Sequence, residues 1–315
     1  MRIIITGGAG FIGANFIHYW ARGHPNDEIV NIDLLTYASD LSYLQGLKAK
    51  NYTFLHRDIA DRGLMLRLVR DADAIVNFAA ESHVDRSISD SEPFIHSNIG
   101  GVHSILEAVR KYEKRFHHIS TDEVFGSLSL GSKKRFTEQT LYNPSSPYAA
   151  SKAAADQLVR AYHHTYKLPV TISTSGNNYG RFQHPEKLIP KVIIGALANK
   201  TITLHGSGLQ MRDWIFVDDH CSAIETILRK GEMGETYCVS AEDEKNITDI
   251  AKMILDMLDR PHSLMTFKGE RLGEDIRYAS DPSKIRRNLK WKPAYSFEHG
   301  IRFTLDYYWG RYGKE

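Results

Sequence analysis

Cysteine is scarce in this sequence: among 315 residues there are two, Cys221 and Cys238. Two cysteines are too few for a disulfide framework or a cysteine-based metal cluster, so we interpret both as small buried apolar residues. No apolar run approaches the roughly 18 residues of a membrane-spanning helix. The chain begins with a strand-like segment, Arg2–Thr6, and not with a basic-then-apolar leader. We therefore expect a cytoplasmic protein with neither a membrane partner nor a metal.

An excess of either charge is also missing. Forty Lys and Arg residues nearly balance 38 Asp and Glu residues, which gives a net charge of +2. This balance gives no reason to expect a nucleic acid as partner. The hydrophobic share of 42% is ordinary for a globular protein, and the chain is long enough for a sizeable core.

Short β-branched runs alternate with helical patterns in the first half of the chain. The helical patterns include Phe11–Arg22, Ile95–Tyr112 and Tyr148–Tyr166. The expected strands are Arg2–Thr6, Glu28–Ile32, Thr53–Leu55, Ala74–Phe78, Phe116–Ser120 and Val170–Ser175. Alternation of this kind predicts βαβ units and an α/β fold, a Rossmann-type doubly wound parallel sheet.

The rhythm loosens after about residue 176. Helical patterns continue at Leu188–Asn199, Asp219–Arg229, Ile247–Leu258 and Phe297–Tyr312. We expect residues 1–175 to form a dinucleotide-binding domain and residues 176–315 a smaller α/β substrate-binding portion. Strand-like segments within residues 214–239 are expected to return to the first domain. The long polar loop Gly126–Pro147 is expected to cover a site.

Glycines at the first strand-to-helix turn predict a cofactor site. Gly7, Gly10 and Gly13 permit a tight turn and let a pyrophosphate approach the backbone at the helix start. Asp33 ends the second strand, where a carboxylate binds ribose hydroxyls and repels a 2′-phosphate, which favours NAD over NADP. Further cofactor contacts are expected after the third and fourth strands, at Asp58, Ile59, Ala79 and Ala80.

Tyr148 and Lys152 share one helix face, because they are four residues apart. An ammonium beside the phenol should lower the pKa of Tyr148 and prepare it as a base, and Lys152 can also hold the nicotinamide ribose. Asp122 and Glu123 follow the fifth strand at its carboxyl end, where ligands of such sheets bind. One carboxylate can remove a carbon-bound proton while the other protonates a leaving hydroxyl. The segment His83–Ser87 is expected to line the cleft between cofactor and substrate.

These motifs resemble the extended short-chain dehydrogenase/reductase superfamily, and within it the dTDP-glucose 4,6-dehydratases. The resemblance covers nearly the whole chain. Its strings are Thr6–Gly13, Asp33–Ala38, Ala79–Ile88, Ser120–Gly126, Tyr148–Lys152, Asn177–Gly180, Pro185–Pro190 and Arg212–Trp214. Related decarboxylases and GDP-mannose dehydratases usually carry serine at the position of Asp122, which makes this aspartate the sharpest marker.

The resemblance implies a reaction and a set of roles. Tyr148 would take the proton of the sugar C4 hydroxyl while hydride passes to NAD, with Thr121 hydrogen-bonded to that oxygen. Glu123 would then remove the C5 proton and Asp122 protonate the C6 hydroxyl, so that water leaves and hydride returns to C6. The product would be a nucleotide-4-keto-6-deoxyhexose, formed without net consumption of NAD.

The remaining site residues also come from the resemblance. Phe11, Ile12 and Thr36 are assigned to the cofactor. The substrate is assigned to Ser82, His83, Thr121, Asn177, Glu186, Lys187, Leu188, Thr203, His205, Arg212 and Arg277, with Arg212 as a phosphate clamp. The resemblance further implies a homodimer that pairs the helices at Ile95–Tyr112 and Tyr148–Tyr166.

Departures from the family pattern lie mostly on the nucleotide side. They are Thr174, Gly176, Arg181, Thr203, His205, and the segment Leu272–Asp275 with Glu274. They leave open whether dTDP-glucose, the first candidate, or a UDP-sugar is the substrate. The alternative is that these departures reflect sequence drift in a pocket that tolerates substitution. An epimerase or decarboxylase of the same superfamily is the alternative enzyme, and a non-catalytic dinucleotide sensor is the alternative of another class.

Overall fold

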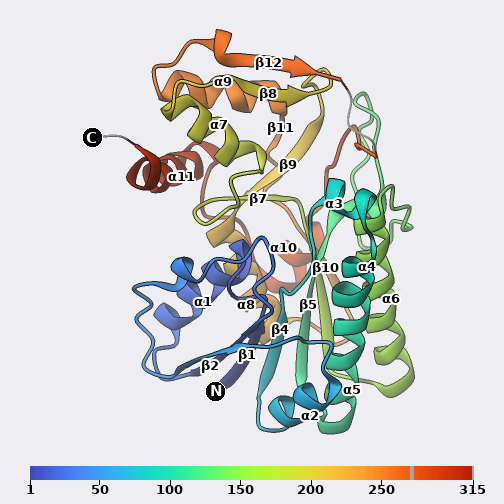
Figure 1. Ribbon diagram of the computed structural model, residues 1–315. Helices are drawn as coiled ribbons and strands as arrows, with labels where there is room; N and C mark the ends of the chain where they lie inside the picture. The colour runs from blue at the N-terminus through green and yellow to red at the C-terminus, as the bar shows by residue number, and fades with distance from the viewer. Residues whose placement is uncertain (270–272, 314–315) are drawn as a thin grey trace.

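Seven parallel strands form the central sheet of the computed structural model, which describes residues 1–269 and 273–313 (Figure 1). Their order is β10-β6-β5-β4-β1-β2-β3. The bounds are β1 Arg2–Thr6, β2 Glu28–Asp33, β3 Tyr52–His56, β4 Ala74–Asn77, β5 Arg115–Thr121, β6 Val170–Ser175 and β10 Thr236–Val239. The order reverses between β1 and β4, and such a switch point is where open α/β sheets bind ligands. The predicted Rossmann-type sheet is confirmed.

Helices cover both faces of this sheet (Figure 1). On one face lie α2 (Arg62–Arg70), α5 (Val102–Tyr112) and α6 (Pro147–Tyr166), and on the other α1 (Phe11–Gly23) and α8 (Val217–Lys230). Strand β1 is buried on both sides, because Ile4 joins the core under α2 and α5 while Ile3 and Ile5 join the core under α1 and α8. An almost uninterrupted apolar strand is typical of such a doubly covered sheet.

The helix predicted over Ile95–Tyr112 is divided into two parts. A π-helical segment, η2, spans Ile95–Gly101 and continues into α5. Gly101 packs closely against Ile59, since a Cβ there would lie 2.4 Å from the Ile59 Cδ1 atom. Before η2 come the short helices α3 (Val84–Ser89) and α4 (Glu92–Phe94).

The C-terminal part carries two small sheets, drawn above the central sheet in Figure 1. Strands β11, β9 and β7 form one, and β12 and β8 form the other. The strand bounds are β7 Asn177–Tyr179, β8 Ile202–His205, β9 Met211–Phe216, β11 Glu244–Asn246 and β12 Met265–Lys268. The helices after residue 176, besides α8, are α7 Leu188–Leu197, α9 Ile247–Met257, α10 Ser283–Leu289 and α11 Phe297–Tyr312. Along the whole described chain there are also the 3-10 turns η1 Leu41–Leu44, η3 Asp122–Phe125 and η4 His262–Leu264.

One apolar core joins the two parts. Ile193 of α7, Ile254 of α9 and Leu305 of α11 belong to the same buried cluster as Ile3 and Trp20 beside the central sheet. Within residues 214–239, β10 extends the central sheet beside β6, whereas β9 belongs to the three-stranded sheet. Among the described residues, no helix is long and apolar enough to cross a membrane.

Candidate active site

The turn between β1 and α1 depends on its glycines. Gly7 has a φ of +71°, and a Cβ there would lie 2.5 Å from the Ala79 nitrogen after β4. A Cβ at Gly13 would lie 2.3 Å from the Gly7 carbonyl oxygen. Helix α1 begins at Phe11 with a glycine as its N-cap, so its first N–H groups receive no side-chain cap. A pyrophosphate can accept those hydrogen bonds and is favoured by the helix dipole.

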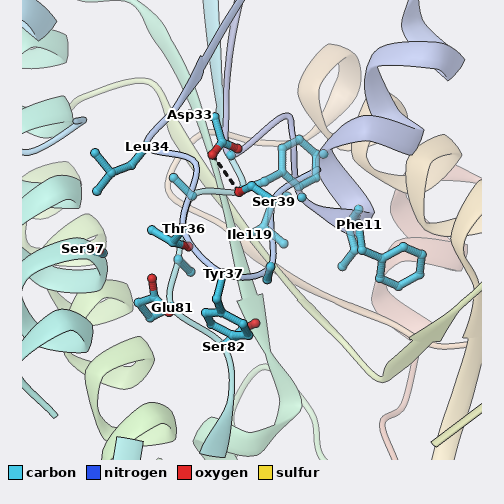
Figure 2. A pocket seen from close by; sticks show the side chains of 18 of the residues that line it. Phe11, Asp33, Leu34, Thr36, Tyr37, Ser39, Glu81, Ser82, Ser97 and Ile119 are labelled. Carbon is cyan, nitrogen blue, oxygen red and sulfur yellow. Dashed lines mark hydrogen bonds between the residues drawn. The ribbon is translucent and has the colours of Figure 1, made fainter. Parts of the chain in front are cut away.

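Asp33 organises the loop that follows β2. Its Oδ2 accepts a hydrogen bond from the Ala9 N–H at 2.9 Å. Its Oδ1 accepts from the Leu35 N–H and the Ser39 hydroxyl, each at 2.8 Å, the latter drawn in Figure 2. An ionised carboxylate has about four lone-pair positions, so it can still accept from ribose hydroxyls.

A cavity at the carboxyl ends of the strands contains all the residues expected to bind the cofactor (Figure 2). They are Gly7, Gly10, Phe11, Ile12, Gly13, Asp33, Thr36, Asp58, Ile59, Ala79, Ala80, Tyr148 and Lys152. The sequence did not single out Tyr37, Gln183 and His184, which also line this cavity. The Arg86 guanidinium lies 3.7 Å from the centre of the Tyr37 ring. No local sequence pattern predicts this cation–π contact, because the two residues are far apart in the chain.

A second cavity adjoins the first. Both have Ser82, Gln183, Glu186 and Lys187 in their walls. Predicted substrate residues in the second cavity are Ser82, His83, Asn177, Glu186, Lys187, Leu188 and Arg212, and Glu123 lies with them. Val84, from the segment expected to line the cleft, also lies in its wall, and the wall residues that were not predicted include Trp214, Ile247, Gly273, Asp275 and Tyr278. The two cavities together can hold a dinucleotide and a second ligand next to each other.

Four predicted substrate residues are not among the described residues that line either cavity: Thr121, Thr203, His205 and Arg277. Thr203 and His205 lie on β8, where they pair with Thr266 and Lys268 of β12. Arg277 donates two hydrogen bonds to the Glu244 carboxylate, at 2.7 and 3.0 Å. Their role in substrate binding stays a prediction.

Two departures from the family pattern have a structural explanation. Arg181 donates to the Asn15 Oδ1 at 2.6 Å and lies 3.6 Å from the Asp218 carboxylate, so it ties α1 to α8. Gly176 is required by close packing, since a Cβ there would lie 2.5 Å from the Asp213 carbonyl oxygen. Glu274 lines the second cavity, and Leu272 lies outside the described residues.

Tyr148 and Lys152 are both buried on α6. Lys152 Nζ donates to the Ile119 carbonyl at 2.7 Å, and burial lowers the pKa of Lys152 to about 8. The pKa of Tyr148 is raised, first by burial and then by the Glu123 carboxylate, although a hydrogen bond from Thr121 opposes this. The predicted lowering of the Tyr148 pKa is thus wrong for the protein alone, because burial and the Glu123 carboxylate raise this pKa.

Asp122 and Glu123 occupy different environments, although they are neighbours in η3. Asp122 is 2% exposed. Burial raises the pKa of Asp122 well above its usual range, and the carboxylates of Glu123 and Asp213 act in the same direction. The protonated form of Asp122 is therefore favoured, while Glu123 lies in the wall of the second cavity. The pair has the unequal environments that an acid and a base need. Thr121, whose hydroxyl accepts from the Glu123 N–H at 3.3 Å, immediately precedes them.

A glycine turn at the switch point of a parallel sheet, with Tyr148 and Lys152 beside the cavity, defines a dinucleotide-dependent enzyme of the short-chain dehydrogenase/reductase class. The model of the GDP-mannose 4,6-dehydratase family matches residues 4–304. A dTDP-glucose 4,6-dehydratase of Mycobacterium tuberculosis is 47% identical over 98% of this chain and 93% of its own length. A dTDP-glucose 4,6-dehydratase of Xanthomonas campestris is 48% identical over 97% of this chain and 92% of its own length.

Solved structures agree with these relatives. The dTDP-glucose 4,6-dehydratase DesIV of Streptomyces venezuelae, solved with NAD bound, has a TM-score of 0.95 and 40% identity, with 99% of each chain covered. A UDP-glucuronic acid 4-epimerase of Bacillus cereus has a TM-score of 0.92 at 27% identity, with 99% of this chain and 100% of the other covered. The chain belongs to the dTDP-glucose 4,6-dehydratase family, as its motifs predict.

Proposed function

We propose that this protein is a hydro-lyase that uses bound NAD to convert a nucleotide-hexose, dTDP-glucose first among the candidates, into the nucleotide-4-keto-6-deoxyhexose. The observation that supports it most is the division of the carboxyl pair. Asp122 is buried and its pKa is raised, and Glu123 lines the second cavity. An epimerase that oxidises and reduces one carbon needs Tyr148 and Lys152 but no such second acid and base.

The first cavity fits NAD. The glycine turn and the start of α1 receive the pyrophosphate, Asp33 the adenosine ribose, and Lys152 the nicotinamide ribose. NAD, when bound, accepts the C4 hydride and returns it to C6, and its positive ring favours the ionised form of Tyr148. Because the hydride returns within each turnover, NAD stays bound and is not consumed.

The side chains divide the proton transfers among themselves. Tyr148 takes the proton of the C4 hydroxyl, and Thr121 hydrogen-bonds the same oxygen. The ketone formed at C4 acidifies the C5 proton, which Glu123 removes. Asp122 gives its proton to the C6 hydroxyl, so that water leaves, and C5 is then reprotonated. This order requires Asp122 to start protonated, in agreement with its burial.

The second cavity suits the diphosphate of a nucleotide-sugar. The Arg212 guanidinium is held by the Asp275 carbonyl at 2.8 Å and lies 4.5 Å from the centre of the Tyr278 ring. Lys187, from the wall that both cavities share, adds a second cation. A guanidinium fixed in this way is a pre-organised phosphate ligand.

Three further assignments accompany this activity. The seven-stranded part binds NAD, and the C-terminal portion binds the nucleotide-sugar. Two copies form a homodimer in the cytoplasm through the η2–α5 segment and α6, which pack side by side in one chain (Figure 1). Ile95 and Tyr166, at the ends of these helices, are about half exposed and supply apolar surface for the contact. The product enters deoxysugar biosynthesis.

Mass spectrometry of nucleotide-sugars tests the proposal. The purified protein is incubated in parallel with dTDP-glucose, UDP-glucose and UDP-N-acetylglucosamine. We expect loss of one water from dTDP-glucose without added NAD. Water loss from a UDP-sugar alone would keep the dehydratase and replace its substrate. An unchanged mass with an epimerised sugar, or no reaction with any of the three, would overturn the proposed activity.

A further inference from the structure

A carboxylate behind the reactive groups is not used by the mechanism above. Asp156 lies on α6 one turn after Lys152, and none of its surface is exposed. Its Oδ2 accepts hydrogen bonds from the Ser120 hydroxyl at 2.7 Å and from the Tyr142 hydroxyl at 2.8 Å. It thus connects α6, the end of β5 and the long loop before α6.

Lys152 and Asp156 hold consecutive residues of β5. The ammonium of Lys152 binds the Ile119 carbonyl, and the carboxylate of Asp156 binds the Ser120 side chain. Thr121, Asp122 and Glu123 follow directly. The place where the chain leaves the sheet and presents these three residues is therefore fixed from behind by two groups of opposite charge.

Asp156 has two basic neighbours, His118 and Lys152. His118 Nε2 of β5 lies 3.4 Å from Asp156 Oδ1, but burial, and then the charge of Lys152, lower the pKa of His118 to about 4. His118 is therefore neutral near pH 7. Arg160, one turn further along α6, donates to the Tyr142 hydroxyl and to Thr236. Burial favours protonation of Asp156, yet His118, Lys152 and Ser120 keep the pKa of Asp156 below its usual value.

We propose that Asp156 is a positioning residue that keeps Lys152 protonated and holds the end of β5 in register with the catalytic side chains. A buried ammonium loses its proton easily unless an anion is near. Lys152 must be charged to bind the nicotinamide ribose and to favour ionised Tyr148. The measurement of kcat/KM that tests this role rests on the proposed function. The measurement of retained NAD does not depend on it.

The test compares Asp156→Asn with Tyr142→Phe, which removes a hydrogen bond to Asp156 but leaves its charge. For each protein the pH profile of kcat/KM and the fraction of NAD retained after gel filtration at each pH are measured. Without the anion, we expect the alkaline limb and the loss of NAD to move to lower pH by about one unit or more. In Tyr142→Phe both should stay at the pH of the native protein.

An Asp156→Asn protein that loses activity equally at every pH, with an unshifted NAD profile, would overturn the inference and make Asp156 merely structural. If Asp156→Asn does not fold, Asp156→Ser is smaller, leaves room for a water, and carries the same expectation. Inactivity of the native protein towards every nucleotide-hexose would refute the proposed function alone. The shift in NAD retention would then still decide the role of Asp156.

Discussion

At the scale of single residues, the site works through differences in environment between similar groups. Asp122 and Glu123 are adjacent in sequence, but one is buried and the other lines the substrate cavity. Burial disfavours the charged form, and a neighbouring carboxylate adds to that effect. The roles of acid and base therefore follow from position and not from residue type.

Removal of the base should separate oxidation from elimination. Glu123→Gln keeps Tyr148 and Lys152, so substrate addition should still produce NADH absorbance. Water loss should fall by about 10²- to 10⁴-fold, the usual contribution of a general base. Tyr148→Phe is the matched control and should give no NADH. Absence of an NADH signal in Glu123→Gln would contradict the division of roles.

Asp122 should make the protein less stable as the pH rises. In the unfolded chain its carboxyl loses the proton above about pH 4, whereas the raised pKa in the folded protein moves this loss to higher pH. The free energy of unfolding therefore decreases from about pH 4 up to the folded pKa, by about 1.4 kcal/mol for each pH unit in that interval. Asp122→Asn lacks this pH dependence, so its stability advantage in urea unfolding should grow as the pH rises from about 4 towards the folded pKa, while its activity is lower than that of the native protein. An advantage that does not vary with pH would contradict this interpretation.

At the scale of elements, the cofactor cavity depends on a turn in which Gly7 and Gly13 leave no room for a Cβ. The glycines let the backbone between β1 and α1 lie against the residues after β4. The same contacts shape the cavity and hold the two strands in place.

Two glycines of helix α1 allow a matched test of this turn. Gly13→Ala would place a Cβ 2.3 Å from the Gly7 carbonyl oxygen, whereas a Cβ at Gly23 meets nothing within 4 Å. Gly13→Ala should lose bound NAD and about 1–3 kcal/mol of stability through overpacking. Gly23→Ala should keep NAD and gain up to about 1 kcal/mol. Thermal unfolding and NAD content measure both. Equal behaviour of the two variants would refute the close-packing argument.

At the scale of the whole molecule, the two cavities meet where the central sheet faces the C-terminal part. One apolar core runs through both parts. The site is therefore built between them, and the η2–α5 segment and α6 are the helices proposed for contact with a second copy.

The homodimer can be tested with two substitutions of exposed apolar residues. Ile95, in η2, and Trp309, in α11, are 51% and 53% exposed. We expect size-exclusion chromatography with light scattering to give a dimer for the native protein and for Trp309→Glu, and a monomer for Ile95→Glu. A charge buried without a partner at the contact destabilises it. A native monomer, or a dimeric Ile95→Glu protein, would contradict the proposed interface.

Much of this structure could be predicted, because its signals are local. Runs of β-branched residues gave β1 and β6 with their observed bounds, and the cofactor residues lie in short motifs at strand ends. Gln183 and Tyr278 were missed, since segments far apart in the sequence bring them to the site. The direction of the Tyr148 pKa shift was also missed, because it depends on burial and on Glu123. The π-helical segment η2, whose last residue Gly101 packs against Ile59, was also missed, because no periodicity in the sequence indicates it.

The central claim is that one site oxidises C4, eliminates water across C5 and C6, and returns the same hydride to C6. The most direct measurement is NMR of the product formed from dTDP-glucose deuterated at C4. We predict that deuterium appears at C6 of a 4-keto-6-deoxyhexose, with a solvent-derived proton at C5. Deuterium that is lost to solvent, or that returns to C4 of an intact hexose, would contradict the account.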